Sequence, residues 1–234
     1  MFENPKSMMD AIGQLETFAQ RIVDGEGKTK KVELLSRLPK SFGAVALEKF
    51  FGEMTPEQTL DVTENQMRLG DVLYSQKGIS SSINVDNSVF VEDRLKDRLM
   101  QLCSHYRYPR VLEFTEIRPM PPADEINAIF FELKQHDITI ALDDFGTGFN
   151  GMSIFADYDF DIIKIDQSMI IGLESRPQKK RILGHIREML SALDKTHVVE
   201  GVETQERFDT LRELGFDTFQ GYLFHKPARL EEIT

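Results

Sequence analysis

The stretch of sequence that decides the fold is VLEFTEIRPMPPADEINAIFFELKQHDITIAL, which spans residues 111–142. Its hydrophobic pattern predicts a buried strand, an amphipathic helix and a second strand, at residues 111–115, 123–136 and 139–142. Two strands joined by a helix through short loops run parallel, and the helix covers one face of their sheet. We therefore expect an α/β fold in which this unit is repeated.

The same alternation continues on both sides of this stretch. Further strands are predicted at residues 79–85, 162–165, 197–199 and 218–223. Further helices are predicted at residues 55–73, 91–105, 151–158, 179–193 and 206–214. Nearer the N-terminus, the sequence predicts two strands, at residues 17–23 and 31–35. The DGEG turn between them is typical of an antiparallel hairpin.

The predicted strands number about eight, which is the number that closes a (β/α)8 barrel of the TIM type. The alternative is an open, doubly wound sheet, but no glycine-rich phosphate loop follows an early strand. We choose the barrel. The sequence predicts a single domain over residues 17–234, preceded by a short helical lead-in over residues 1–16.

The composition is that of an ordinary soluble protein, with 41% hydrophobic and 29% charged residues in a chain of 234. Apolar runs are of strand length, far short of the roughly 20 residues that span a bilayer, and no export signal is visible. Cys103 is the single cysteine, which excludes an internal disulfide and is typical of a reducing compartment. We therefore expect a cytoplasmic protein without a membrane segment.

The net charge of −11 argues against a nucleic-acid polymer as partner, because such binding needs clustered lysine and arginine. The short basic run at residues 28–31 is interrupted, and we interpret it as a solvated turn before a strand. A small anionic ligand stays compatible with the net charge, because bound divalent cations reverse the local sign.

Two adjacent carboxylates, Asp143 and Asp144, end the strand predicted at residues 139–142. Successive residues of a strand point to opposite faces, so both acids reach one site only if the chain turns there. Gly146 and Gly148 permit such a turn. Two neighbouring carboxylates repel, and one would take up a proton unless a cation lay between them. A metal site and a hydrated turn are both consistent with this stretch alone.

Polar residues also end the other predicted strands. They are Glu33, Asn84, Glu113, Glu116, Lys164, Asp166, Glu200, Glu203 and Gln220. Each one alone is explained by a helix cap, a turn or a solvated side chain. Together they lie at the carboxyl ends of barrel strands, where catalytic groups are found in such barrels. Oxygen ligands without cysteine or histidine suit Mg2+ or Mn2+, and the set is large enough for two cations, the arrangement that attacks phosphodiesters.

With these residues in place, the chain resembles the EAL domain family of bacterial cyclic di-GMP phosphodiesterases. The resemblance rests on seven motifs that follow the family order from about residue 17 to the C-terminus. They are Glu33-Leu34-Leu35 with Ser36 and Arg37, Ser82-Ile83-Asn84, Leu112-Glu113-Phe114-Thr115-Glu116, Asp143-Asp144-Phe145-Gly146-Thr147-Gly148, Lys164-Ile165-Asp166, Val199-Glu200-Gly201-Val202-Glu203-Thr204 and Gln220-Gly221-Tyr222.

The resemblance implies a modified TIM-type (β/α)8 barrel whose first strand is antiparallel to the others, in agreement with the predicted hairpin. It implies hydrolysis of cyclic di-GMP to linear pGpG with two Mg2+ or Mn2+ ions per active site, bridged by Asp143. The implied ligands of these ions are Glu33, Asn84, Glu113, Asp143, Asp144 and Glu200.

The resemblance also implies catalytic and substrate-binding roles. Lys164 would position or deprotonate the attacking water, Glu200 is the competing candidate for the base, and Glu33 belongs to the same catalytic group. Because nearby anions raise the pKa of a lysine, we favour Lys164 as the residue that orients hydroxide. The implied substrate contacts are Arg37, Leu35, Gln220, Asp166 and Gln20.

The sequence departs from the family pattern at three places. Leu34 replaces the usual alanine, and Arg21 replaces the proline that commonly follows Gln20. Residues 149–152 replace an aromatic-Ser-Ser-Leu sequence. The second departure weakens the expected substrate contact of Gln20, and the third leaves the behaviour of the loop open.

Glu116 and Glu203 are expected to support the loop after Asp144, a segment that the family links to metal binding and dimerisation. A homodimer and a regulatory protein are the protein partners that this expectation leaves open, beside cyclic di-GMP itself. The alternative function is a non-catalytic cyclic di-GMP receptor or protein-interaction module on the same fold. Inactive family members have typically lost metal ligands or the catalytic lysine, and this sequence retains both.

Overall fold

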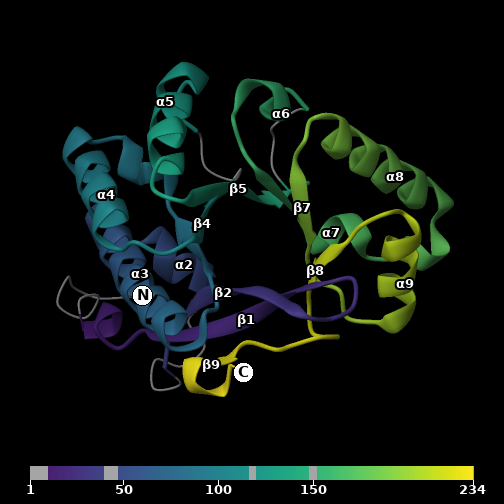
Figure 1. The fold of residues 1–234 in the computed structure, drawn as a ribbon, viewed down its shortest axis with the longest axis horizontal. Coiled ribbons are helices and arrows are strands. Elements are labelled where there is room, and N and C mark those ends of the chain that lie inside the picture. Colours follow the sequence, from purple (N-terminus) through teal and green to yellow (C-terminus); the bar gives the residue numbers. More distant parts are fainter. Residues whose placement is uncertain (1–9, 40–46, 116–119, 148–151, 234) are drawn as a thin grey trace.

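The computed structural model describes residues 10–39, 47–115, 120–147 and 152–233. Within these residues the strands form one sheet in the order β2-β3-β4-β5-β6-β7-β8-β1-β9, and β1 also pairs with β2 (Figure 1). The strands are β1 (Glu16–Asp24), β2 (Thr29–Arg37), β3 (Ser81–Val85), β4 (Arg110–Thr115), β5 (Ile138–Phe145), β6 (Ile162–Ile165), β7 (Thr196–Val199), β8 (Thr218–Gln220) and β9 (Ala228–Arg229). The pairing of β1 with β2 closes strands β1 to β8 into a barrel.

Helices alternate with the strands from β2 onward. The α-helices are α2 (Leu47–Gly52), α3 (Pro56–Lys77), α4 (Asp93–His105), α5 (Ala123–Lys134), α6 (Ile154–Asp157), α7 (Gln167–Ile170), α8 (Pro177–Ala192) and α9 (Gln205–Glu213). The short 3-10 helices are η2 (Asn87–Phe90), η3 (Leu173–Ser175) and η4 (Leu230–Glu232).

The first strand runs against the rest of the barrel. β1 is antiparallel to β2 and to β8, whereas β2 to β8 pair in parallel. The β1–β2 hairpin closes where the Asp24 carboxylate accepts hydrogen bonds from the backbone N–H groups of Glu26 and Lys28, at 3.0 and 2.9 Å. The predicted (β/α)8 barrel with an antiparallel first strand is therefore confirmed.

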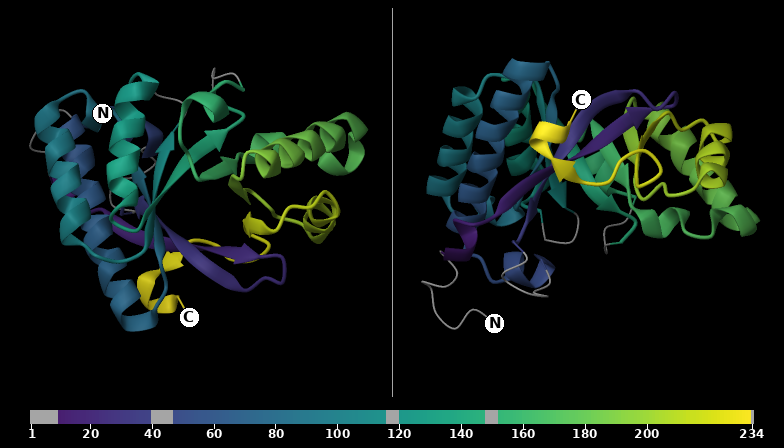
Figure 2. Two further views of the ribbon diagram at one scale, coloured as in Figure 1. Left: turned by 45° about the horizontal axis from the view of Figure 1, so that its top comes forward. Right: turned by 90° about the horizontal axis from the view of Figure 1, so that it is seen from below.

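The barrel wall separates two of the hydrophobic clusters, because alternate residues of each strand point to opposite sides of this wall. Outward residues such as Leu112 and Leu142 pack beneath the helices. Helices α3, α4 and α5 line up along one side of the barrel, and α8 and α9 lie on another (Figure 2). Inside the barrel, one ring of small and branched side chains forms an apolar layer, made of Ile22, Val111, Ala141, Ile162 and Val198.

Helix α3 begins as the sequence predicts. Thr55 accepts a hydrogen bond from the backbone N–H of Gln58, the Gln58 side chain accepts one from the backbone N–H of Thr55, and Pro56 follows the cap. The helix runs four residues further than predicted and ends at Gly78, whose φ of 67° only glycine adopts without strain.

Other predicted elements differ from the structure in length or position. The strand predicted at residues 218–223 ends at Gln220, and within the described residues the helix predicted at 151–158 is limited to α6. The pattern does not predict α2, α7 or β9, because each is too short to show a periodicity. Most of the predicted lead-in at residues 1–16 lies outside the described residues.

The interpretation of residues 28–31 as a solvated turn is wrong from Thr29 onward. Strand β2 already begins at Thr29, and the backbone of Lys31 pairs with that of Ile22. Three of the four residues at 28–31 are lysines, and this obscures the start of the strand. A lysine side chain inside a barrel is not expected from polarity alone.

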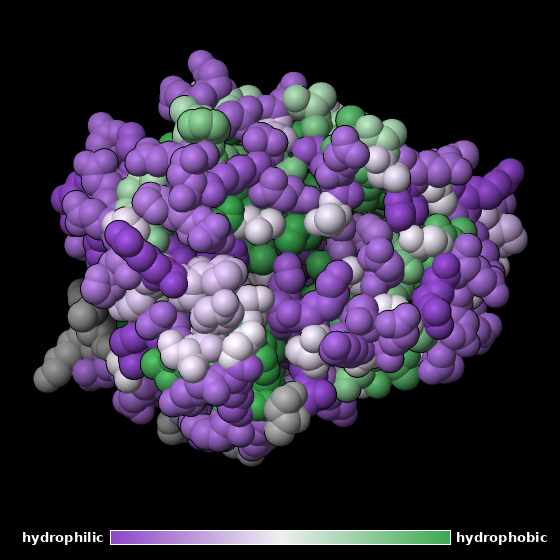
Figure 3. Space-filling model, in the orientation of Figure 1, coloured by the Kyte–Doolittle hydropathy of each residue, from purple (hydrophilic) through white to green (hydrophobic). Residues whose placement is uncertain are grey.

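Polar side chains cover most of the face shown in Figure 3, with apolar groups confined to small patches. Within the described ranges, no helix is both long enough and apolar enough to span a bilayer.

His197 should make the stability of the fold depend on pH. This side chain is 5% exposed, and its Nε2 accepts a hydrogen bond from the backbone N–H of Asp217 at 3.1 Å, which requires a neutral ring nitrogen. Burial lowers the pKa of His197 to about 4, although the charge of Asp217 opposes the shift. In the unfolded chain this histidine has its ordinary pKa of 6.5, so as the pH falls the unfolded state binds a proton before the folded state does. Stability should therefore fall by up to about 3 kcal/mol as the pH drops from about 6.5 to 4.

Urea unfolding at a series of pH values, on wild type and on His197→Gln, checks this. The glutamine offers an acceptor but does not titrate, so the difference in unfolding free energy between the two proteins should shrink as the pH falls. A difference that is constant from pH 7.5 to pH 4.5 would contradict the role of His197.

Candidate active site

A buried lysine lies at the centre of the carboxyl end of the barrel. Lys164 of β6 is 1% exposed, and its Nζ lies 2.8 Å from Glu113, 2.9 Å from Asp143, 2.9 Å from Glu200 and 3.6 Å from Glu33. These acids come from β2, β4, β5 and the residue after β7, so four segments converge on one ammonium. We call Glu33, Glu113, Asp143 and Glu200 the carboxylate cluster.

Glu33 is fixed by two amides as well as by the lysine. It accepts hydrogen bonds from Asn84 Nδ2 at 3.1 Å and from Gln220 Nε2 at 2.6 Å. Gln220 also bonds Gln20 Oε1 at 3.2 Å, and Gln20 Nε2 bonds the carbonyl of His225 at 3.0 Å. A chain of amides thus ties the β1–β2 hairpin to β8 and orients the Glu33 carboxylate toward the centre.

The chain turns at Asp144 itself. Asp144 has a φ of 58°, a left-handed conformation that aspartate tolerates better than most residues, and its N–H bonds Asp143 Oδ1 at 3.0 Å. The pairing of β5 with β6 shifts register at this point, as strands do where a bulge redirects a side chain. The sequence predicts a turn that lets both acids face one site, but assigns it to glycines. Gly146, with φ 108°, continues the turn, and Gly148 lies outside the described residues.

Glu200 is held by the loop that follows β7. Its backbone N–H bonds the carbonyl of Ile165 at 3.0 Å, which extends the β6–β7 ladder by one residue. The next residue, Gly201, has a φ of 65°, and a Cβ there would lie 2.3 Å from Cβ of Gln167. Glycine therefore lets the Glu200 segment approach α7 closely.

The charges of the cluster do not balance, because one ammonium faces four carboxylates. Burial raises the pKa of Glu113 to about 8, against the opposing charge of Lys164. Burial also raises the pKa of Glu200 well above its ordinary value, and it raises that of Asp144 to about 6, where Asp143 adds repulsion. Burial acts to lower the pKa of Lys164, but the four carboxylates outweigh it and raise that pKa well above its usual range.

Glu33 differs from Glu113 and Glu200 in the direction of its pKa shift. Burial acts to raise its pKa, but the charge of Lys164 and the hydrogen bonds from Gln220 and Asn84 outweigh it, so the pKa of Glu33 is lowered. The site thus combines a stable anion with carboxyl groups that keep protons unless a cation replaces them.

The carboxylates can hold metal ions in two overlapping groups of three. One group is Glu33, Glu113 and Asp143, and the other is Asp143, Asp144 and Glu200; within each, ligand oxygens lie within 4.8 Å of one another. Asp143 belongs to both. The residues therefore fit a pair of hard cations that share one carboxylate, and Asn84, bonded to Glu33, offers an amide oxygen beside the first group.

Two cavities open on either side of this cluster. One, of about 330 Å3, extends toward α2 and α3 and is lined by residues including Phe51, Val62 and Thr63. The other, of about 470 Å3, extends toward α7 and β8. The two share three wall residues, Leu35, Arg37 and Asp144. We call them the α3 lobe and the α7 lobe.

The remaining residues that the sequence predicts lie outside the carboxylate cluster. Asp166 and Glu203 line the α7 lobe, where Asp166 also caps α7 by accepting a hydrogen bond from Ser168 N–H at 2.8 Å. Glu203 is exposed, and Glu116 lies outside the described residues. The structure thus brings the predicted ligands and the lysine together, while the roles assigned to individual residues stay predictions.

Helix α3 contributes a wall of the site that is not among the sequence predictions. Thr63 Oγ1 bonds the carbonyl of Asn84 at 3.2 Å, and Gln66 Nε2 bonds the carbonyl of Leu34 at 3.0 Å. These two buried polar residues position β2 and β3 beneath the α3 lobe, and the buried Thr59 lines the same lobe. Their spacing of four and three residues places them on one face of α3, and a polar stripe among buried leucine and methionine is the signal that reveals them.

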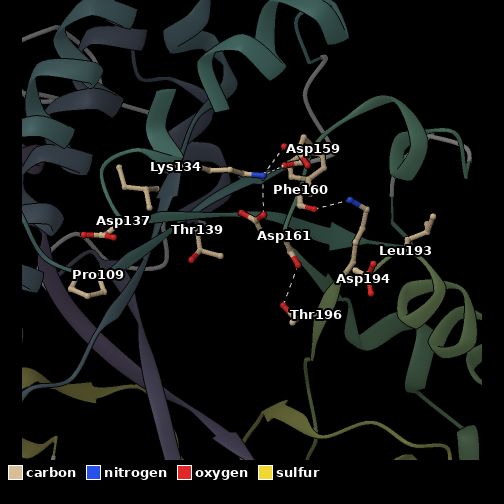
Figure 4. A pocket seen from close by; sticks show the side chains of 12 residues that line it. Pro109, Lys134, Asp137, Thr139, Asp159, Phe160, Asp161, Leu193, Asp194 and Thr196 are labelled. Atoms are coloured by element: carbon tan, nitrogen blue, oxygen red, sulfur yellow. Dashed lines mark hydrogen bonds and ion pairs between the residues drawn. The ribbon is translucent and has the colours of Figure 1, made fainter. Parts of the chain in front are cut away.

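A third cavity, of about 730 Å3, lies at the other end of the barrel, where strands β4 to β7 begin (Figure 4). Its two lysines already have partners: Lys134 Nζ lies 2.8 Å from both Asp159 and Asp161, and Lys195 Nζ donates a hydrogen bond to the carbonyl of Phe160 at 2.8 Å. Thr196 bonds the Asp161 carbonyl at 3.1 Å. This end of a barrel serves stability in known enzymes, and the paired charges here link β6, β7 and α5. We therefore place function at the carboxyl end.

Comparison with known proteins agrees with this geometry. The sequence matches the EAL domain family over residues 7–227. It is 30% identical over 228 residues to PdeG of Escherichia coli K12, named a probable cyclic di-GMP phosphodiesterase. That match covers 92% of this chain and 45% of PdeG, so the chain spans less than half the length of that relative.

Solved structures share the fold. An EAL domain protein from Listeria monocytogenes EGD-e superposes with a TM-score of 0.82 over 99% of this chain and 97% of its own, at 24% identity. BlrP1 of Klebsiella pneumoniae, in complex with manganese and cyclic di-GMP, superposes with a TM-score of 0.76 over 92% of this chain and 56% of its own, at 24% identity. These two likenesses establish the fold, and the sequence match covers nearly all of it. The chain belongs to the EAL domain family.

Proposed function

We propose that this chain hydrolyses cyclic di-GMP to linear pGpG, using two divalent cations at the carboxylate cluster. The observation that carries the proposal is the pair of overlapping carboxylate groups that share Asp143 beside the buried ammonium of Lys164. Its relatives support this substrate, because PdeG is named a probable cyclic di-GMP phosphodiesterase and BlrP1 has been solved in complex with manganese and cyclic di-GMP.

Six residues would hold the two ions, Mg2+ or Mn2+: Glu33, Asn84, Glu113, Asp143, Asp144 and Glu200. When bound, such a pair of cations lowers the pKa of water and neutralises charge on the phosphodiester oxygens. The chain supplies the geometry: the amides on Glu33 and the turn at Asp144 fix carboxylates from different strands in one place.

Lys164 and Glu200 would act on the attacking water. Lys164 keeps its proton, since its pKa is raised, so it can donate a hydrogen bond to hydroxide but is a poor base. Glu200 has a raised pKa, which makes it the better proton acceptor of the two once it is ionised. Attack of the water oxygen on phosphorus breaks one phosphodiester bond, and the ring opens to pGpG.

The two lobes suit a ligand with two nucleobases. Arg37 and Leu35 lie on the wall shared by the lobes. In this proposal Arg37 would bind a phosphate between the two bases. The α7 lobe would receive one base beside Asp166 and Gln20. Within the described residues, Gln220 Oε1 is buried without a hydrogen-bond partner, which suits a role in orienting water or ligand.

Metal removal should stop turnover. We expect dialysis against EDTA to lower the rate of cyclic di-GMP hydrolysis by at least about 100-fold, because the cations would supply most of the positive charge that stabilises the leaving oxygen. Initial rates measured after addition of Mg2+ or Mn2+ should recover. Full activity in EDTA would exclude the cation-dependent mechanism.

The function itself is tested by incubating purified protein with cyclic di-GMP and Mg2+ and separating the nucleotides by chromatography. We expect pGpG to accumulate with time. Cyclic di-GMP that binds but stays intact would favour the alternative, a non-catalytic receptor on the same fold.

We also propose a cytoplasmic location and control by self-association or by a partner protein. The single cysteine, Cys103, is buried and free, as expected in a reducing compartment. Light scattering on the purified protein tests for a homodimer.

A further inference from the structure

Lys31 points into the barrel, one layer beneath the carboxylate cluster. Residues two apart on a strand share a face, so Lys31 faces the same way as Glu33, which contacts Lys164 inside the barrel. The pairing of β1 with β2 agrees: Lys31 lies opposite Ile22, and Gln20 lies opposite Glu33. Directly opposed residues of an antiparallel pair share a face.

The surroundings of Lys31 are apolar. Ile22 belongs to the apolar layer inside the barrel, whose other members are Val111, Ala141, Ile162 and Val198. Each of these lies two residues before a member of the layer above, as Val111 does before Glu113 and Ile162 before Lys164. Lys31 occupies the corresponding position before Glu33, where the other strands carry an apolar or small side chain.

Lys31 is partly buried, and among the described residues its side chain has no hydrogen-bond or ion-pair partner. Burial lowers its pKa, the charge of Glu113 opposes that shift, and the charge of Lys164 adds to it. The ammonium is thus within electrostatic range of the cluster without being part of it.

We propose that Lys31 is an electrostatic positioning residue of the cation site, and that its charge weakens the binding of divalent cations there. The inference rests on the proposed function, because it needs the carboxylate cluster to bind metal. Each arriving cation would add two positive charges one layer above Lys31, and like charges repel each other.

Isothermal titration of nucleotide-free protein with Mn2+ tests the inference without reference to turnover. Lys31→Met keeps the length of the side chain, removes the charge and matches the apolar layer. We expect it to lower the Kd for Mn2+ roughly fivefold, as removal of one nearby charge in a partly buried site should. Lys31→Arg, which keeps the charge, should stay within about twofold of wild type.

Lys28→Met is the matched control, since it makes the same change three residues away on an exposed turn, and its Kd should equal that of wild type. Should Lys31→Met unfold, Lys31→Gln carries the same expectation. An unchanged or higher Kd in a folded, charge-free variant overturns the inference. Failure of wild type itself to bind Mn2+ overturns the cation site of the proposed function, and the inference with it, so the two failures are distinguishable.

Discussion

Asp143→Asn should reduce the kcat/KM for cyclic di-GMP by at least ~1,000-fold while the fold persists. Asp143 is the carboxylate common to both groups of potential metal ligands, so one substitution removes an anion from each. Asparagine has the same shape and keeps the oxygen that accepts the Asp144 N–H, so the turn at Asp144 should survive. Initial rates in saturating Mg2+ measure the effect, with circular dichroism and thermal unfolding as checks on the fold.

Asp159→Asn is the matched control for this variant. It makes the same chemical change at the opposite end of the barrel, where Asp159 is 62% exposed and pairs with Lys134. Its turnover should equal that of wild type. Retention of more than about a tenth of wild-type activity by a folded Asp143→Asn would exclude Asp143 as a bridging ligand.

Lys164→Met should lower both the rate of turnover and the stability of the fold. Divalent cations should restore the stability. Removal of the ammonium leaves four buried carboxylates without their common partner, and breaking such a buried pair typically costs about 3–5 kcal/mol. We expect a lower unfolding midpoint in EDTA, and a larger rise of that midpoint on addition of Mn2+ than wild type shows. Turnover should fall at least ~100-fold even in saturating metal, because the ammonium that would donate a hydrogen bond to the attacking hydroxide is lost.

Thermal unfolding with and without Mn2+ separates the two roles of Lys164. A variant that regains wild-type stability in Mn2+ but not wild-type turnover supports both the cation site and the catalytic role. A variant that unfolds like wild type in EDTA would show that the ammonium does not balance the cluster. Wild-type turnover would exclude the lysine from catalysis.

Much of the barrel is predictable because its strands and helices obey simple periodicities. The unit at residues 111–142 appears in the structure as β4, α5 and β5, and the DGEG turn closes the hairpin that makes the first strand antiparallel. Short elements such as α7 and β9 are not predictable in this way. They form because of contacts with neighbouring parts of the fold, and the local sequence pattern does not reveal such contacts.

The convergence of the site is predictable to the extent that strand ends meet at one end of a barrel. The position of Lys164 at the centre of four carboxylates is not, because it depends on how far each strand is staggered against the next. The turn at Asp144 is not predictable for a similar reason. A bulge in the β5–β6 ladder redirects this acid, and Gly146 comes only after the turn has begun. Lys31 is the clearest case, since its charge suggests solvent while strand alternation places it inside.

The two-cation site is tested most directly by anomalous diffraction from crystals of wild type grown with Mn2+. We expect two manganese peaks, about 4 Å apart, on either side of the Asp143 carboxylate. One should face Glu33 and Glu113, and the other Asp144 and Glu200. A single peak, or peaks that do not contact Asp143, would contradict this site.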